Sequence, residues 1–203
     1  MKKICLIGAG GFAKEVFCLL EDLNRADDVQ CFMETNPLSS SVMGKPIKPI
    51  SQFDDKNNKA IICVGDPEEK QIMLNQLSNT TEFETIIHPT AVISDWVTYG
   101  IGNIICAGAV ITCNISFGDF NVVDRNSSIG HDCTLGDFVH LTPGVVISGN
   151  VTIGNNVYFG TNSVVKERIN ICSKVTIGLN SGVINDINKP GVYIGTPAII
   201  IND

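Results

Sequence analysis

Two of the three histidines in this 203-residue chain lie in one stretch, SSIGHDCTLGDFVHLTPG, at positions 131 and 140. His131 is followed directly by Asp132, and an adjacent carboxylate can orient an imidazole and stabilise the imidazolium that forms when the ring takes a proton. Histidine is the side chain best suited to act as a general base near neutral pH. The pair is therefore a candidate base for acyl transfer from a thioester to an amine or a hydroxyl. An exposed turn histidine beside a turn aspartate is the alternative interpretation.

The histidines are poorly spaced for a zinc site. His88, His131 and His140 are 43 and 9 residues apart, so the spacing that brings two ligands together on one loop is missing. The eight cysteines include no Cys-x-x-Cys pair, and in a reducing compartment they act as small apolar residues. We therefore expect no metal ion.

A six-residue period surrounds the histidines and predicts the fold of this part of the chain. Every sixth residue from Ile87 to Val183 is apolar, and the residue four places further on is mostly small or β-branched. This period does not fit an amphipathic helix, and an ordinary β-sandwich has no reason to keep it for so long. It predicts a β-solenoid with three units per coil and about 4.8 Å between coils. On this register His131 lies at or near a corner and points outward, and His140 closes the next unit.

A glycine-rich motif near the N-terminus indicates a nucleotide site. Residues 3–7, KICLI, predict a buried strand that turns tightly into a helix. Gly8, Gly10 and Ala13 satisfy G-x-G-x-x-A, in which glycines let the backbone approach a phosphate at the helix N-terminus. Glu34 follows the second predicted strand, where an acidic residue can bind a ribose. The alternative is that the glycines only pack the helix against the strand.

The length of this front part limits what it can hold. Further strands are predicted at 29–33 and 60–65, followed by a helix beginning near residue 66. We expect a domain over residues 1–86 and a second over 87–203. The first is roughly half of a complete dinucleotide domain, so it suits a mononucleotide or a nucleotide diphosphate better than a nicotinamide cofactor. A dehydrogenase is therefore disfavoured.

The overall charge of the chain disfavours two kinds of binding partner. The formal net charge is −7, and no basic run occurs, which argues against binding to nucleic acid or to an anionic membrane surface. The apolar run after the first two lysines ends at a glycine turn, too early for a signal-peptide core or a spanning helix. We therefore expect a cytoplasmic protein.

The front motif GAGGFAKEV joined to a six-residue repeat resembles the hexapeptide-repeat sugar acetyltransferases. These are bacterial enzymes that N-acetylate nucleotide-linked amino sugars, with the sialic acid O-acetyltransferases as relatives. The resemblance implies an α/β N-terminal Rossmann-like half-domain, then an all-β left-handed parallel β-helix, assembled as a homotrimer that uses acetyl-CoA. The segment GHDC matches the place of the family's catalytic histidine and its acidic neighbour. His131 is then the catalytic base, and Asp132 supports it.

The same resemblance implies the binding residues. The front domain would hold the nucleotide of the sugar substrate through Gly10, Gly11, Phe12, Glu34, Thr35, Asn36 and Gly65. Contacts to acetyl-CoA would come from His140, Gly149 and Thr161, with the C-terminal segment GTPA at 195–198 beside the CoA tail. Two positions depart from the pattern. Phe12 stands where some relatives have histidine, and Asp124 stands where relatives often have asparagine.

The sequence therefore predicts an N-acetyltransferase that transfers the acetyl group directly from acetyl-CoA. The expected substrate is a nucleotide-linked 4-amino-4,6-dideoxy sugar that feeds surface-polysaccharide or glycan synthesis. One alternative is O-acetylation of a sialic or related acid, which is the same chemistry on a hydroxyl. A second is a non-enzymatic trimeric scaffold that binds nucleotides through its front domain.

Overall fold

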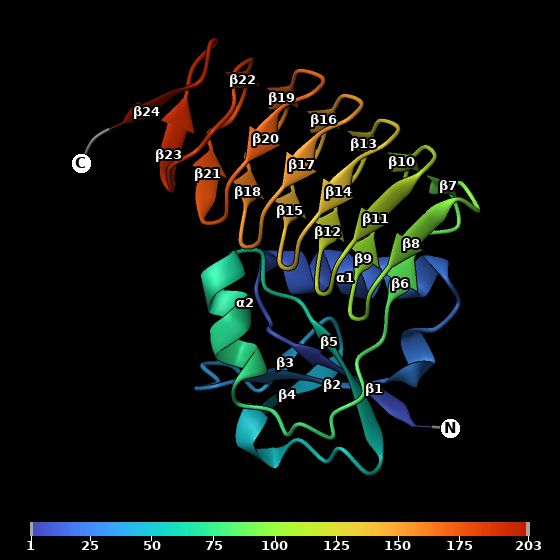
Figure 1. Ribbon diagram of the computed structural model, residues 1–203. Helices are drawn as coiled ribbons and strands as arrows, with labels where there is room; N and C mark the ends of the chain where they lie inside the picture. Colours follow the sequence, from blue (N-terminus) through green and yellow to red (C-terminus); the bar gives the residue numbers. More distant parts are fainter. Residues whose placement is uncertain (1, 202–203) are drawn as a thin grey trace. The chain divides into compact units, whose positions relative to one another are not determined.

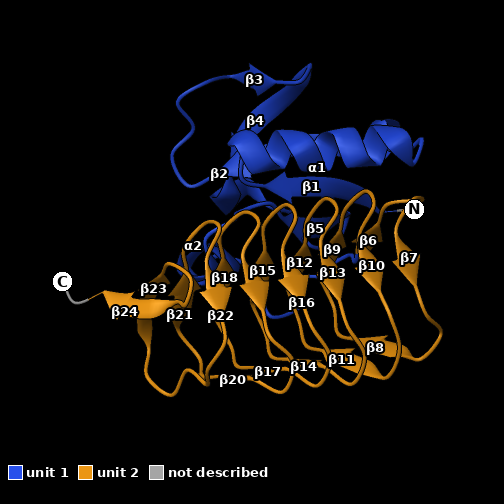
Figure 2. Cartoon of the chain, turned by 90° about the horizontal axis from the view of Figure 1, so that it is seen from above, with its two compact units in different colours: residues 1–85 blue, residues 86–203 orange. Residues whose placement is uncertain are grey.

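The computed structural model describes residues 2–201 and consists of two compact units (Figure 2). Unit 1 comprises Met1–Thr85 and unit 2 comprises Ile86–Asp203. Unit 1 is an α/β structure and unit 2 is a left-handed parallel β-helix, as the sequence predicted. Within the described residues, no helix is both long and apolar enough to span a membrane.

Within residues 2–85, unit 1 is built on a five-stranded sheet of order β3-β4-β2-β1-β5 (Figure 1). Strands β1, β2, β4 and β5 pair in parallel, and β3 is antiparallel to β4. The bounds are β1 Lys3–Ile7, β2 Val29–Glu34, β3 Ser41–Val42, β4 Lys45–Pro49 and β5 Asn58–Ile62. Because β1, β2 and β5 are parallel, the segments that follow them lie at one edge of the sheet, where such folds bind ligands.

The helices of unit 1 follow the predicted strands. Helix α1, Gly11–Asp22, buries apolar side chains at helical spacing against the sheet, and α2, Pro67–Leu74, begins at Asp66. The Asp66 carboxylate caps α2 by accepting the backbone N–H groups of residues 68 and 69, each at 2.9 Å. Short 3-10 helices cover Ala26–Asp28 (η1) and Ile50–Gln52 (η2). The third strand was expected at 60–65, but β5 begins two residues earlier, at Asn58, and ends at Ile62, because the chain then leaves the sheet to reach this cap.

Unit 2 repeats every 18 residues between residues 86 and 183. From Ile86 to Val165, each strand pairs in parallel with the strand three places further along the chain, as Ile111 pairs with Ile129 and Ile129 with Ile147. Three faces result. Face A contains β7 Val92–Ile93, β10 Val110–Ile111, β13 Ser128–Ile129, β16 Val146–Ile147, β19 Val164–Val165 and β22 Gly182–Val183. Face B contains β8 Val97–Tyr99, β11 Ile115–Phe117, β14 Thr134–Leu135, β17 Thr152–Ile153 and β20 Asn170–Ile171.

Face C forms the third side of the β-helix and ends in the closing segment. It contains β6 Ile86–Ile87, β9 Ile104–Ile105, β12 Val122–Val123, β15 His140–Leu141, β18 Tyr158–Phe159, β21 Val175–Ile177, β23 Gly191–Ile194 and β24 Ile199–Ile201. Strand β24 turns back antiparallel to β23. This hairpin ends the ladder of parallel strands.

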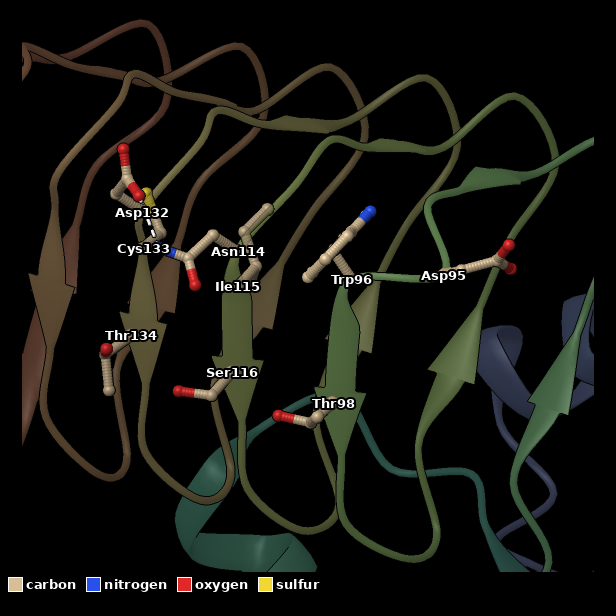
Figure 3. Close-up of a pocket in the computed structure, with 9 residues that line it drawn as sticks. All are labelled: Asp95, Trp96, Thr98, Asn114, Ile115, Ser116, Asp132, Cys133 and Thr134. Carbon is tan, nitrogen blue, oxygen red and sulfur yellow. Dashed lines mark hydrogen bonds between the residues drawn. The ribbon is translucent and has the colours of Figure 1, made fainter.

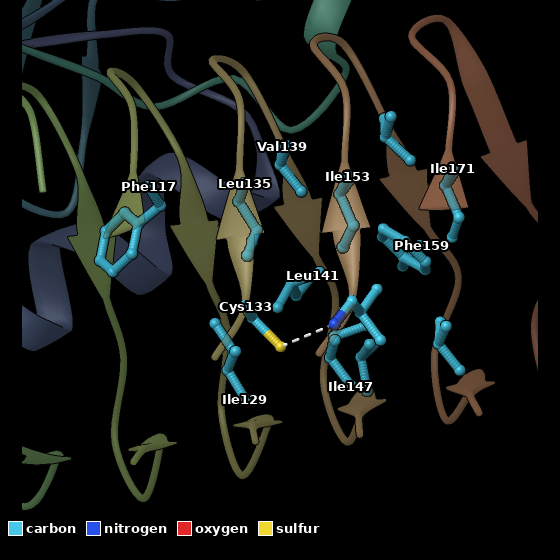
Figure 4. Close-up of a cluster of buried hydrophobic side chains, with 14 of the residues drawn as sticks. Phe117, Ile129, Cys133, Leu135, Val139, Leu141, Ile147, Ile153, Phe159 and Ile171 are labelled. Atoms are coloured by element: carbon cyan, nitrogen blue, oxygen red, sulfur yellow. Dashed lines mark hydrogen bonds between the residues drawn. The ribbon is translucent and has the colours of Figure 1, made fainter. Parts of the chain in front are cut away.

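The inward side chains of the repeat form one continuous core along the β-helix (Figure 4). Every sixth residue from Ile105 to Val183 is buried, as the period predicts. Tyr99 departs from the pattern and is 41% exposed, with its ring stacked 5.5 Å from that of Phe117. It lies in the first coil, which has a coil packed against it on one side only.

The corner between faces A and B repeats one backbone conformation in successive coils. Asn114, Asp132, Asn150 and Arg168 are 18 residues apart, and their φ angles lie between 56° and 62°. Asparagine and aspartate tolerate this left-handed conformation better than most residues with a side chain. The corner residues of successive coils are consequently stacked along the β-helix. That stacking positions the candidate site.

Candidate active site

His131 and Asp132 lie on the corner between β13 and β14, where the chain passes from face A to face B. Backbone hydrogen bonds hold this corner to the coils on both sides. The N–H of Asp132 donates to the carbonyl of Cys113 at 3.1 Å, and the N–H of Asn150 donates to the carbonyl of His131 at 2.8 Å. The backbone under the two side chains is therefore fixed by the ladder rather than left in a free loop.

The two side chains form a hydrogen-bonded pair that remains open to solvent. Nδ1 of His131 is 2.7 Å from Oδ2 of Asp132, and the side chains are 58% and 42% exposed. An ionised carboxylate only accepts hydrogen bonds, so Nδ1 is the nitrogen that carries the proton. The lone pair of the neutral ring is then on Nε2, the far nitrogen. This arrangement lets His131 take a proton from a bound acceptor through Nε2.

The carboxylate of Asp132 has a second partner, which the sequence analysis missed. Nδ2 of Asn114 donates to Oδ1 of Asp132 at 2.5 Å. The hydrogen bonds from Asn114 and then from His131 lower the pKa of Asp132 below the ordinary value. The carboxylate is therefore ionised throughout the neutral range. Asn114 precedes Asp132 by one full coil, so the 18-residue offset was the signal that could have found it.

Gly149 lies against the ring of His131, one coil further along. A β-carbon built on Gly149 would be 2.6 Å from Nε2 and 2.7 Å from Cε1 of His131. Carbon atoms do not approach that closely, so any side chain at 149 would displace the imidazole. The structure thus brings three of the predicted residues, His131, Asp132 and Gly149, to one corner.

A hollow of about 450 Å³ opens on face B beside Asp132 (Figure 3). The side chains that line it come from three successive coils and are Asp95, Trp96, Thr98, Asn114, Ile115, Ser116, Asp132, Cys133 and Thr134. Trp96, the tryptophan of the chain, is 77% exposed there. Its indole lies one coil before Asn114, and the sequence analysis did not single it out.

Two other predicted residues lie elsewhere on the β-helix. His140 belongs to β15 on face C, where it is only 4% exposed and its ring meets that of Tyr158 edge-on at 5.4 Å. Thr161 is exposed on the corner between faces C and A, with its hydroxyl 3.5 Å from that of Thr142. Within one chain, neither residue reaches the corner of His131. Asp124 is also buried, and its carboxylate accepts the N–H of Arg125 at 2.6 Å.

The glycines of the front motif have separate tasks. Gly8 has a φ of +114°, and a β-carbon there would lie 2.9 Å from the carbonyl oxygen of Cys63, so this glycine allows β1 and the end of β5 to approach. Gly10 caps α1 and Gly11 begins it, and a β-carbon at either would meet no atom within 4 Å. The space at the helix N-terminus is open to a ligand.

A pocket of about 320 Å³ in unit 1 lies beside Glu34, which ends β2 and is half-buried. It is lined by Ala9, Lys14, Glu34, Leu38, Ser39, Ser41, Val42 and Ile47. Ala9, which lies between Gly8 and Gly10 in the glycine turn, lines the same pocket as Glu34. The other predicted nucleotide contacts are accessible: Thr35 and Asn36 are exposed after β2, and Phe12 and Gly65 are half-buried.

The third histidine is bound within its own turn. Nδ1 of His88 accepts the N–H of Thr90 at 3.1 Å in the first coil. Among residues 2–201, no group of three or more His, Cys, Asp or Glu side chains is arranged to hold a metal ion. All eight cysteines are free thiols.

An α/β unit with a glycine turn, followed by a left-handed β-helix with a histidine and a carboxylate on one corner, is the architecture of hexapeptide-repeat sugar acetyltransferases. Residues 3–77 match the model of the PglD N-terminal domain family. The resemblance predicted from the sequence is confirmed by this match and by the solved structures that the whole chain resembles. A search of curated protein sequences found no match.

Three of the similar solved structures cover the entire fold. A point mutant of perosamine N-acetyltransferase from Caulobacter crescentus, in complex with CoA and GDP-perosamine, is 25% identical over 100% of this chain and 98% of that one, with a TM-score of 0.92. The acetyltransferase domain of PglB from Neisseria gonorrhoeae FA1090, in complex with acetyl coenzyme A, is 26% identical over 98% and 99%, with a TM-score of 0.88. WeeI from Acinetobacter baumannii AYE, 23% identical over 99% and 100%, shares the fold with a TM-score of 0.91.

Proposed function

We propose that this protein is an N-acetyltransferase that moves the acetyl group of acetyl-CoA to the amine of a nucleotide-linked 4-amino-4,6-dideoxy sugar, for surface glycan or polysaccharide synthesis. The comparisons confirm the coarser class, a sugar acetyltransferase that uses acetyl-CoA. The observation that carries the proposal is the His131–Asp132 pair, in which the carboxylate binds Nδ1 of a half-exposed imidazole and leaves Nε2 to accept a proton. The carboxylate of this pair also borders a hollow of about 450 Å³ on face B.

The chemistry follows from the protonation of that pair. The neutral amine of the acceptor attacks the carbonyl carbon of the thioester, and Nε2 of His131 takes the proton that the nitrogen loses. The imidazolium is stabilised by the ionised carboxylate of Asp132, 2.7 Å away. The tetrahedral intermediate collapses as the carbon–sulfur bond breaks, and the imidazolium returns the proton to the CoA thiolate. One amide bond forms, one thioester bond breaks, and no acyl-enzyme is needed.

The donor requires more than one copy of the chain. His131, Asp132 and Gly149 share one corner, whereas His140 and Thr161, the other predicted acetyl-CoA contacts, are on face C and on a different corner. In a homotrimer the corner of one copy can face another side of its neighbour, so acetyl-CoA would lie between two copies. Contact with the buried His140 ring then requires that side chain to move.

The acceptor is held by its nucleotide in unit 1. Gly10 and Gly11 leave open space at the N-terminus of α1 for a phosphate, and Glu34 lies beside the neighbouring pocket for the ribose or base. Phe12, Thr35, Asn36 and Gly65 surround the same edge of the sheet. We place the reaction in the cytoplasm, where eight free cysteines stay reduced.

Release of CoA thiol from acetyl-CoA, measured with a panel of acceptors, tests this proposal. The panel contains nucleotide-linked 4-amino sugars, the same nucleotide sugars with a hydroxyl at that position, and free sialic acids. We expect thiol release with the amino sugars alone. Release only with hydroxyl acceptors would favour sugar O-acetylation, and inertness toward every acceptor together with nucleotide binding would favour a scaffold. Either result would contradict the proposal.

A further inference from the structure

We propose that Asn114 is a positioning residue for this reaction, acting on His131 through Asp132. The inference rests on the proposed function, because it assumes that His131 is the base. Asn114 was not among the residues expected from the sequence or from the resemblance. The structure identifies Asn114, because its amide is hydrogen-bonded to the carboxylate that orients the imidazole.

The two oxygens of Asp132 have different partners. Oδ1 accepts from Nδ2 of Asn114 at 2.5 Å (Figure 3). Oδ2 is 2.7 Å from Nδ1 of His131. A carboxylate with one partner can rotate about its χ2 angle, which has a broad energy minimum. With both oxygens engaged, the plane of the carboxylate is fixed, and Oδ2 stays directed at the imidazole.

The contact between Asn114 and Asp132 follows from the repeating backbone of the β-helix. Asn114 and Asp132 occupy the same corner position 18 residues apart, with φ angles of 56° and 61°. The hydrogen bond from the N–H of Asp132 to the carbonyl of Cys113 joins the two coils directly beneath the side chains. The short amide of Asn114 therefore reaches Asp132 without a flexible stem, so little side-chain entropy is lost in holding it.

An uncharged amide is well suited to hold the carboxylate of Asp132 in place. A lysine or arginine at this position would compete with the imidazolium for the negative charge of Asp132. The amide fixes the carboxylate and leaves its charge to the imidazole. Among the described residues that line the hollow, the charged ones are Asp95 and Asp132, both acidic, so the side chains of the hollow bring no cation to the carboxylate.

Asn114→Asp is the most informative variant, because it keeps the size of the side chain and its tolerance of the left-handed backbone. It replaces the amide donor by a second carboxylate, which repels Asp132. We expect kcat to fall by about 10-fold or more, with the KM values of both substrates changed less than about 2-fold. The acid limb of the pH profile of kcat should move to higher pH, since the added negative charge favours the imidazolium. Unchanged kcat and pH profile would overturn the inference.

Asn114→Ala and Asn126→Ala form a matched pair for the structural role of asparagine. Asn126 has a φ of 57° and is exposed, but it lies on the corner between faces C and A. Both variants lose an asparagine from a left-handed position, so both should lower the melting temperature by a similar amount. Only Asn114→Ala should lower kcat. An equal loss of kcat in both would mean that the asparagine serves the backbone alone.

A double-mutant cycle shows whether Asn114 acts through Asp132. In an Asp132→Ala background, Asn114→Ala should have no further effect on kcat, because the group that it positions is gone. A further loss of about 10-fold would contradict the inference. His131→Ala distinguishes failure of the proposed function from failure of the role of Asn114. If His131→Ala keeps full activity, the proposed function itself is wrong. If His131→Ala and Asp132→Ala are impaired and Asn114→Asp is not, only the role of Asn114 is wrong.

Discussion

The imidazole of His131 packs against Gly149, the residue that lies one coil further along the β-helix. A β-carbon at position 149 would come within 2.6 Å of Nε2 and 3.1 Å of Cδ2. The orientation of the ring therefore depends on two coils at once. Asp132 holds the imidazole at Nδ1. Gly149, which has no side chain, leaves the space that the Nε2 side of the ring occupies.

Gly149→Ala should impair catalysis by moving the imidazole. The added methyl group overlaps the ring, and crowding of this kind costs about 1–3 kcal/mol of stability. We expect kcat to fall by about 10-fold or more, because small displacements of a base are costly. Gly154→Ala is the control: its β-carbon would meet Ser173 at 2.6 Å, away from the pair. It should lower the melting temperature without the loss of kcat, and equal losses of kcat would contradict the account.

Glu34→Gln should weaken binding of the nucleotide sugar. Glu34 lies beside the pocket next to the glycine turn, and a hydrogen bond from a ribose hydroxyl to a carboxylate is stronger than one to an amide. We expect the KM for the nucleotide sugar to rise by about 10-fold and the KM for acetyl-CoA to stay unchanged. Glu21→Gln, at an exposed position on α1 that does not line this pocket, should change neither constant. A rise in the KM for acetyl-CoA would be inconsistent with a nucleotide site in unit 1.

Lys70 should make unit 1 more stable as the pH rises above neutrality. The side chain is 1% exposed, and burial lowers its pKa from 10.5 to about 7, although the charge of Asp66 acts in the opposite direction. Between these two values the unfolded chain binds more protons at this site than the folded chain, so folding becomes more favourable with increasing pH. Lys70→Met should therefore raise the melting temperature at pH 7, and the advantage should shrink toward pH 10. An advantage that is constant with pH would refute this role of Lys70.

The inward positions of the repeat should dominate the stability of unit 2. Ile153 and Thr152 are neighbours on β17, but Ile153 is 2% exposed in the core and Thr152 is exposed. Ile153→Ala should cost about 3 kcal/mol in the free energy of unfolding, because it leaves a cavity between coils. Thr152→Ala should cost less than about 1 kcal/mol. Chemical denaturation of the two variants measures both values, and similar losses would argue against the six-residue register.

The six-residue register could be read from the sequence because it depends on one physical rule. A short strand has alternating side chains, so a large apolar residue repeated every six positions marks the inward side of each strand. The buried series from Ile105 to Val183 follows that rule. In unit 1, β3 and β4 were missed. Strand β4 contains Pro46 and Pro49, and proline within a short run argues against a strand assignment, although here β4 pairs on both sides, with β2 and with the two-residue β3.

The residues that contact His131 and Asp132 were harder to predict, although the 18-residue offset between coils can be read from the sequence. Three units per coil give an 18-residue repeat, which places Asn114 one coil before Asp132 and Gly149 one coil after His131. The register alone does not say which way a side chain turns at a corner. The hydrogen bond of Asn114 and the ring contact at Gly149 depend on those side-chain angles. His140 is a different case: it lies on β15 beside the inward Leu141, so strand alternation predicts an outward side chain, and its burial on face C did not follow from the register.

The central claim is that His131 is the base for acetyl transfer, and His131→Ala tests it most directly. The measurement is the rate of thiol release from acetyl-CoA with a nucleotide-linked 4-amino sugar, at saturating concentrations of both substrates. The account predicts that kcat falls by about 10²- to 10⁴-fold near neutral pH, while the variant keeps the melting temperature of the wild type within a few degrees. A folded His131→Ala variant that retains the wild-type kcat would contradict it.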